Sequence, residues 1–133
     1  MKISLCLAGG GIKGAAHVGV LKALEEKQIE ITHIGGTSSG SIVSALHAAG
    51  LTADEIYEVV FESEKNEECC NNFIEVAGRS IDLLCRELSQ YEMNGADRVL
   101  TIRSEKVGLL DIDKMDYLYE LGYQQAREFL NEV

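Results

Sequence analysis

The stretch from Gly35 to Gly40, "GGTSSG", places two small hydroxyl residues between glycines at a point where the sequence pattern changes. Residues 29–35, "IEITHIG", are rich in β-branched residues, which is typical of a strand. Residues 39–50, "SGSIVSALHAAG", have the small and apolar side chains of a packed helix, and Gly50 is suited to end it. The sequence therefore predicts a tight turn from a strand into a helix.

The same turn contains the pattern Gly-x-Ser-x-Gly, with Ser38 at its centre and Gly36 and Gly40 at its ends. In a nucleophile elbow, small flanking residues relieve crowding, so that a strained serine projects its Oγ from the edge of the sheet. The backbone N–H of the next residue, Ser39, then points at the oxyanion that develops during ester cleavage. Because this pattern also occurs by chance, a catalytic interpretation requires support from the rest of the chain.

A glycine-rich loop one β-α unit earlier gives that support. Residues 2–8, "KISLCLA", are a short apolar run of the kind found in buried parallel strands, and helical spacing of apolar residues begins at Gly14. The loop between them, "GGGIKG" at 9–14, lets backbone N–H groups approach an anion at a helix N-terminus. The first fifty residues therefore predict a β-α-β-α order with parallel strands.

The loop also matches the dinucleotide-binding pattern Gly-x-Gly-x-x-Gly, which provides an alternative function. That pattern requires an acidic residue about 20 positions on, at the carboxyl end of the second strand, to bind the ribose. The only nearby acid, Glu30, lies at the beginning of that strand. A dinucleotide-binding module is therefore disfavoured, and no Gly-Lys-Ser/Thr follows that would make the loop a nucleotide P-loop.

With these motifs the chain resembles the patatin-like phospholipase family. The resemblance is carried by "GGGIKGAAHVGVLKALEE" (9–26) and "IGGTSSGSIVSAL" (34–46), and more weakly by residues 94–103 and 108–126, which resemble the closing segment of bacterial members. It implies an α/β protein, with a three-layer α/β/α domain and a parallel central sheet. It also implies a Ser-Asp dyad that hydrolyses acyl esters without a catalytic histidine, metal or cofactor.

On this resemblance, Ser38 is the nucleophile and the oxyanion hole is made by backbone N–H groups. The residues that supply those groups are Gly9, Gly10, Gly11 and Ser39. The residues that support the two motifs are Lys13, Gly14, Gly36 and Gly40. The implied substrate is a lipid or other acyl ester, and the implied process is lipid degradation. The resemblance also implies transient contact with a membrane surface.

The chain departs from the family pattern at the second catalytic residue, an aspartate in a D-G-[AG] motif. No Asp-Gly pair is present, and the nearest string begins at Asn94, whose amide cannot take a proton from serine at neutral pH. Family members are also longer, and the polar junction at 63–72 lies where their central segment would be. The prediction is a single domain over 1–133, shortened in the middle, with no dyad aspartate identified.

Without a base the serine is a poor nucleophile, so activity is expected to be weak or absent. The leading rival is a non-catalytic patatin-like remnant whose loop and elbow bind an acyl chain or an anion. Asp97, Asp111 and Asp113 follow in the sequence, but nothing in it places them beside Ser38. A shortened domain also exposes apolar surface, so self-association is expected to be possible.

Composition and charge restrict the classes of partner that the chain is expected to bind. The chain has 133 residues and a net charge of −10, and all of the excess acidity lies after residue 50. This distribution argues against nucleic acid and against electrostatic adhesion to anionic membranes. No apolar stretch approaches the ~20 residues of a membrane span, and the N-terminal apolar run is shorter than that of a signal peptide. The prediction is a cytoplasmic protein.

Several further features are expected to be structural. Thr52 and Glu55 form a capping-box pattern at the start of a helix that extends to about Phe61. Helices are also predicted over 73–97 and 113–133, and a strand over 98–103. The histidines at 17, 33 and 47 are expected to be structural, with a Ser-His pair as a minor alternative. The cysteines at 6 and 85 are expected in the core, and those at 69 and 70 in a loop.

Overall fold

A computed structural model describes residues 1–62, 94–104, 107–108 and 110–132. The regular elements in these ranges, in chain order, are β1 (Lys2–Leu7), η1 (Gly11–Lys13), α1 (Gly14–Glu26), β2 (Glu30–Gly36), α2 (Ser39–Ala48), α3 (Ala53–Tyr57), the π-helical η2 (Glu58–Glu62), the short η3 (Ile112–Lys114) and α5 (Met115–Asn131). The expected polar junction at 63–72 and most of the expected helix over 73–97 lie outside the described residues.

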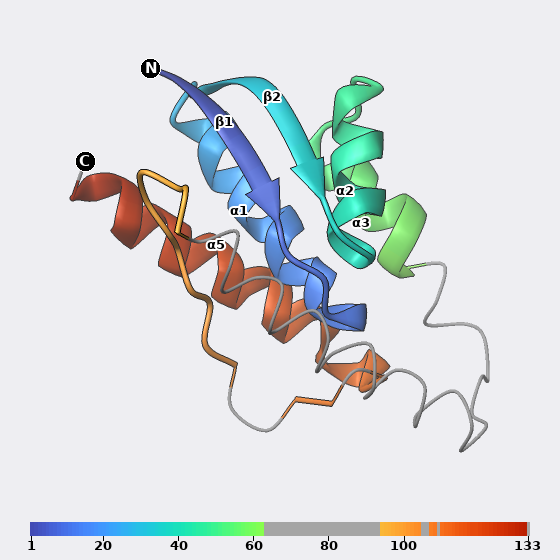
Figure 1. The fold of residues 1–133 in the computed structure, drawn as a ribbon. Helices are drawn as coiled ribbons and strands as arrows, with labels where there is room; N and C mark the ends of the chain where they lie inside the picture. Colours follow the sequence, from blue (N-terminus) through green and yellow to red (C-terminus); the bar gives the residue numbers. More distant parts are fainter. Residues whose placement is uncertain (63–93, 105–106, 109, 133) are drawn as a thin grey trace.

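The two strands are parallel neighbours in one sheet. Their register runs from Lys2 opposite Glu30 to Leu7 opposite Gly36, with one irregularity between Ile3 and Ser4. The α1 helix connects them, as parallel pairing requires of a βαβ unit. The α/β class and the parallel sheet are therefore confirmed, and the arrangement is compatible with a shortened α/β/α fold (Figure 1).

The core is built around α1, which lies between the strands and α5 (Figure 1). The larger hydrophobic cluster draws on β1, α1, α2, α3 and α5 through Leu7, Leu21, Val43, Ile56 and Leu118. A smaller cluster joins Leu24 of α1 to Ala126 of α5. The helix expected over 113–133 is present as α5, and its buried residues Met115, Leu118, Gly122 and Ala126 share one face.

Cys6 is exposed, so the expectation that it is a core thiol is wrong. The reason is strand alternation, because successive side chains of a strand point to opposite faces of the sheet. Leu5 and Leu7 pack into the core, whereas Ser4 and Cys6 lie on the exposed face. The apolar run at 2–8 therefore indicated a strand correctly but overstated its burial. Cys69, Cys70 and Cys85 lie outside the described residues.

Residues 98–103 do not form a strand, contrary to the prediction from their composition. Leu100 and Ile102 nevertheless pack against the cluster formed by Val20 and Leu24. The segment thus contributes side chains to the core without joining the sheet through a hydrogen-bond ladder. The alternating pattern of a strand and that of an extended packed segment are the same, because both bury every second residue.

The capping box at the start of α3 is confirmed. The Oγ1 of Thr52 accepts a bond from the Glu55 backbone N–H at 3.3 Å, and the Thr52 N–H donates to the Glu55 carboxylate at 2.8 Å. The Thr52 hydroxyl also donates to the Glu55 carboxylate at 2.8 Å. The backbone bond from the Thr52 N–H, and then this side-chain bond, lower the pKa of Glu55 below its ordinary value of 4.5. Since the folded pKa is depressed, the stabilisation is present above pH 4.5 and is lost as the pH falls through the folded pKa.

Replacing Thr52 with alanine is expected to lower the free energy of unfolding by about 1 kcal/mol, as for loss of an N-cap elsewhere. Urea titration at pH 7 measures this difference, and Thr52→Ser should retain most of the stability because its hydroxyl can still cap. The difference should shrink below pH 4.5 as the Glu55 carboxyl protonates. A variant as stable as the wild type at pH 7 would show that the cap is dispensable.

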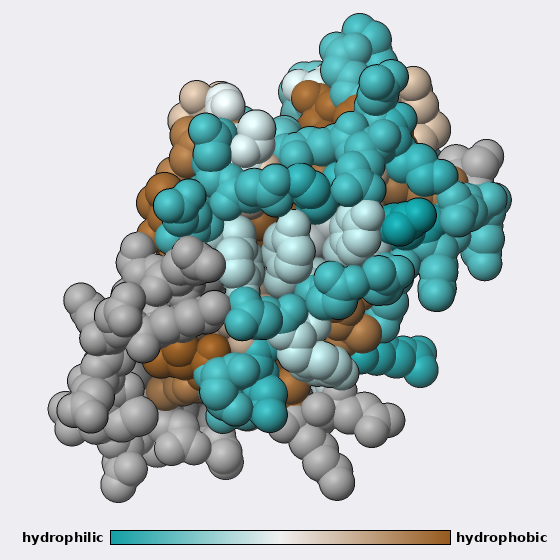
Figure 2. Space-filling model, turned by 180° about the vertical axis from the view of Figure 1, so that it is seen from behind, coloured by the Kyte–Doolittle hydropathy of each residue, from teal (hydrophilic) through white to brown (hydrophobic). Residues whose placement is uncertain are grey.

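The surface seen from behind is mostly hydrophilic over the described residues, with apolar residues in separate patches (Figure 2). Large apolar side chains that are exposed include Ile42, Val59 and Tyr117. Within the described ranges, no helix combines the length and the apolar character that a membrane span requires. Self-association of the chain stays a prediction.

Candidate active site

Ser38 occupies a strained position between β2 and α2. Its backbone has φ 53° and ψ −126°, a combination that residues other than glycine rarely adopt. The residue is exposed and precedes the first turn of α2. Hydrogen bonds fix the turn around it. The Gly40 N–H donates to the Thr37 carbonyl at 3.0 Å, and the Ser38 carbonyl accepts from the Ser41 N–H at 2.9 Å and the Ser41 Oγ at 2.6 Å.

The glycines of the turn are required by close backbone contacts. A Cβ on Gly36 would lie 2.4 Å from the carbonyl oxygen of Gly40, and a Cβ on Gly40 would lie 2.4 Å from that of Leu7. The Thr37 N–H also donates to the Leu7 carbonyl at 3.0 Å. The elbow is therefore packed directly on the end of β1, where the glycine loop begins.

The glycine loop presents backbone N–H groups beside this elbow. Gly10 and Gly11 have positive φ values of 156° and 56°, which side-chain-bearing residues rarely adopt. Gly9 and Gly10 lie outside regular elements, and among the described residues no hydrogen bond is donated by their N–H groups. Ser39 is the first residue of α2, so its N–H has no acceptor within the helix. Such N–H groups are suited to bind an anion or an oxyanion.

Lys13 closes the loop by donating its backbone N–H to the Gly10 carbonyl at 3.1 Å. Its Cβ also lies 3.3 Å from the position that a Cβ on Gly10 would occupy. The side chain is half-buried, and within the described ranges no ion pair involves it. Gly14 ends η1 and begins α1, so both residues help to shape the loop.

His17 contacts the loop through a side-chain hydrogen bond that the sequence did not reveal. Its Nε2 lies 2.7 Å from the carbonyl oxygen of Ala8, the residue before Gly9. Burial is the main cause that lowers the pKa of His17 below 6.5, although the bond to Ala8 raises it. Sequence reasoning treated this histidine as structural. The available signal was its position one turn after Gly14, where a helical side chain can reach back to the loop.

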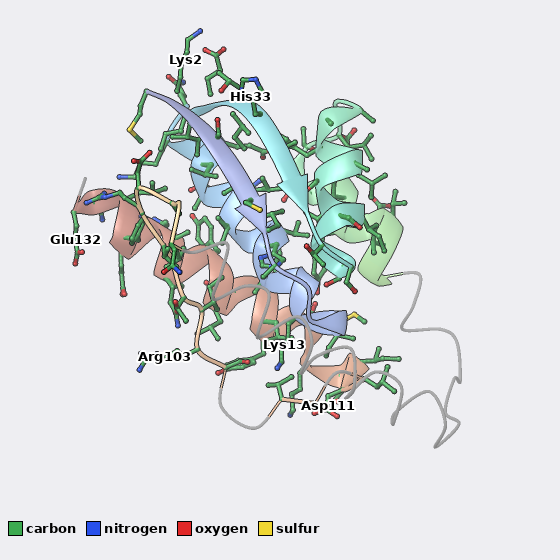
Figure 3. The ribbon with its side chains drawn as sticks, in the orientation of Figure 1. Lys2, Lys13, His33, Arg103, Asp111 and Glu132 are labelled. Atoms are coloured by element: carbon green, nitrogen blue, oxygen red, sulfur yellow. The ribbon has the colours of Figure 1, made fainter. Side chains whose placement is uncertain are left out.

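The remaining histidines and Glu30 lie away from the elbow. The Nδ1 of His33 is 3.5 Å from the Ser4 Oγ, and no hydrogen bond joins Ser38 to His17, His33 or His47 among the described residues. Glu30 begins β2 and pairs with Lys2 at 3.1 Å. Lys2 lies at the end of the molecule opposite Lys13, so this acid is not at the glycine loop (Figure 3).

No carboxylate in the described part of the chain forms a hydrogen bond with Ser38. The Asp111 carboxylate accepts from the Gly108 N–H at 2.6 Å, and Asp113 pairs with Lys114 at 3.3 Å. Asp97 and Asn94 are exposed. Figure 3 shows Asp111 at the same end of the molecule as Lys13. The described ranges also contain no cluster of side chains that could hold a metal ion.

The chain is similar to known proteins in the region that contains these motifs and beyond it. A family model described as patatin-like phospholipase matches residues 5–125. A relative named lysophospholipase NTE1, from Mycosarcoma maydis, is 56% identical over 48 residues. A patatin-like phospholipase domain-containing protein of Caenorhabditis elegans is 52% identical over 54 residues, and human patatin-like phospholipase domain-containing protein 6 is 54% identical over 46 residues.

These three alignments cover 36%, 41% and 35% of this chain. They cover only 2%, 4% and 3% of the relatives, so the chain spans a few percent of the length of the curated proteins it matches. The high identity is therefore a property of a short shared region, and the names of the long relatives describe those proteins as wholes.

Proposed function

Because the chain belongs to the patatin-like phospholipase family, we propose that it hydrolyses acyl esters of lipids with Ser38 as the nucleophile. The observation that carries the proposal is the strained backbone of Ser38, held at a strand-to-helix turn that packs against the glycine loop. Strain of this kind at an exposed serine supports a nucleophile elbow. Such a conformation costs free energy, persists only where the surrounding structure enforces it, and is found most often at active sites.

In this proposal the Ser38 Oγ attacks the ester carbonyl carbon and the carbonyl oxygen becomes an oxyanion. That oxyanion accepts hydrogen bonds from the backbone N–H groups of Ser39 and of the Gly9–Gly11 loop. The C–O bond then breaks, the alcohol leaves with a proton, and the acyl group stays on Ser38. Water cleaves this acyl-serine ester, releasing the fatty acid and restoring the hydroxyl.

The proton of the Ser38 hydroxyl needs an acceptor, and none is hydrogen-bonded to it in the described ranges. General-base assistance typically contributes ~10²–10⁴-fold, so we expect slow turnover if solvent takes this proton. The same observation favours a second candidate function. A patatin-like domain without a base can still bind an acyl chain or an anion through the loop N–H groups.

The substrate class rests on the family and on the printed names of the relatives. The Mycosarcoma maydis relative is named a lysophospholipase, which supports an ester of a lipid rather than of a peptide or nucleotide. The proposal includes transient contact with a lipid surface, and it requires no cofactor or metal. A dinucleotide is disfavoured because Glu30 lies at the wrong end of β2.

The test compares the wild type with Ser38→Ala in the hydrolysis of a short-chain p-nitrophenyl ester. We expect the variant to fall to the uncatalysed rate, because the attacking oxygen is gone. Ser4→Ala is the matched control, since Ser4 is an exposed serine on β1 outside the elbow. Labelling with a fluorophosphonate, located by mass spectrometry, reports a reactive Ser38 even where turnover is slow.

Equal hydrolysis by the wild type and Ser38→Ala, with no label on Ser38, would reject the hydrolase proposal. Binding of a fatty acid measured by calorimetry would then decide for the non-catalytic alternative. Thermal stabilisation by a dinucleotide would instead reject both the hydrolase proposal and the non-catalytic alternative. Labelling of Ser38 without turnover would support an intact nucleophile that lacks its base.

A further inference from the structure

We propose that His17 is a positioning residue that aims the Gly9 N–H by holding the carbonyl of Ala8. This inference rests on the proposed function, because it assigns the Gly9 N–H to the oxyanion hole. His17 itself touches neither the elbow serine nor the reacting atoms in this assignment. Its effect is transmitted through one peptide group.

The tautomer of His17 follows from its partner. The Nε2 atom lies 2.7 Å from the Ala8 carbonyl oxygen, and a carbonyl oxygen only accepts hydrogen bonds. Nε2 must therefore carry the hydrogen. Burial lowers the pKa of His17 below its ordinary 6.5, so at pH 7 the ring donates this hydrogen while neutral.

The geometry of a peptide links this bond to the loop. The Ala8 carbonyl and the Gly9 N–H belong to one planar trans peptide, in which the C=O and N–H bonds point in opposite directions. A donor that fixes the carbonyl therefore fixes the direction of the N–H. The Gly9 N–H donates no hydrogen bond among the described residues. Its direction is therefore fixed while it stays available to an acceptor.

The need for an anchor comes from the glycines that follow. Gly10 and Gly11 both have positive φ, and glycine allows many other backbone conformations at little cost. The preceding carbonyl, that of Leu7, is already bound by the Thr37 N–H of the elbow at 3.0 Å. The Ala8 carbonyl is the next one along the chain, and the side chain of His17 holds it from α1.

The test uses two variants of similar size, His17→Gln, which keeps a side-chain N–H donor, and His17→Met, which has none. We expect His17→Met to shift the NMR signal of the Gly9 amide and to lower kcat for the p-nitrophenyl ester roughly ten-fold. That loss is smaller than the ~10²–10³-fold expected on removing an oxyanion donor outright. His17→Gln should recover much of both properties. His33→Met, the same exchange at an exposed site on β2, should change neither.

A Gly9 amide unchanged in His17→Met, or changed equally in both variants, would overturn the proposal, because packing rather than the donor would then be responsible. If neither variant folds, the wild type decides through the NMR coupling between the Nε2 of His17 and the Ala8 carbonyl carbon: its presence supports the anchor and its absence overturns it. If the wild type shows no Ser38-dependent hydrolysis, the proposed function fails, and the Gly9 amide still decides whether His17 orients the loop.

Discussion

Replacing Gly122 with alanine is expected to lower the free energy of unfolding by at least about 3 kcal/mol, the upper end of the usual range for overpacking. A Cβ on Gly122 would lie 2.0 Å from the backbone carbonyl oxygen of Ala16. The contact is reciprocal, because a Cβ on Gly19 would lie 2.1 Å from the carbonyl oxygen of Tyr119. The α1 and α5 backbones thus cross at these glycines, and neither side has a flexible group that could move away.

The expected change in the free energy of unfolding is opposite in sign to the change that helix propensity predicts. In the interior of a solvated helix, alanine stabilises relative to glycine by about 1 kcal/mol, so helix propensity alone predicts the opposite result. Urea unfolding of Gly122→Ala measures the difference, and Gly35→Ala is the control, because its Cβ would meet nothing within 4 Å. A stabilised Gly122→Ala would show that the two helices can separate at little cost.

The second large effect is expected at Gly40, where alanine should reduce Ser38-dependent hydrolysis by about 10²-fold, as for a displacement of ~1 Å at a reacting group. The added Cβ would lie 2.4 Å and 2.6 Å from the carbonyl oxygens of Leu7 and Ala8. Relieving this collision moves the first turn of α2 away from β1. It therefore displaces both Ser38, the proposed nucleophile, and the peptide that leads into the glycine loop.

This variant is assayed at a temperature where circular dichroism shows it to be folded, so that lost activity is not lost structure. Gly35→Ala again serves as the control, because it lies only three residues before Ser38 and adds the same methyl group in open space. Activity that persists in Gly40→Ala would mean that the close packing of the elbow on β1 is not needed for the reaction.

The elbow and the loop were predictable because their conformations depend on neighbouring residues. Gly36 and Gly40 flank a serine in the pattern that a strand-to-helix turn requires, and the structure places Ser38 there with a strained backbone. The capping box of Thr52 and the positive φ of Gly50 were equally local. The family resemblance drawn from these motifs is confirmed by the match over residues 5–125. The catalytic roles stay proposals.

The features that sequence reasoning missed depend on residues far apart in the chain. Cys6 is exposed because of what covers each face of the sheet, which its own apolar run does not encode. Residues 98–103 have the composition of a strand, yet they pack beside the core without pairing. A base for Ser38 could not be found from the sequence for the same reason, because identifying one requires knowing which distant carboxylate lies close to the serine.

By itself the sequence determined the β-α-β-α order of the first fifty residues, the strand-to-helix turn, the glycine loop and the family. Those properties follow from steric limits and hydrogen bonds within a few residues, which the pattern of glycines, caps and apolar spacing expresses directly. Only the tertiary structure decided that Gly19 and Gly122 meet, that Gly40 rests on β1 and that His17 binds the Ala8 carbonyl. Each of these needs two segments to approach to within a few ångströms, and that proximity is set by packing of the whole core rather than by either segment alone.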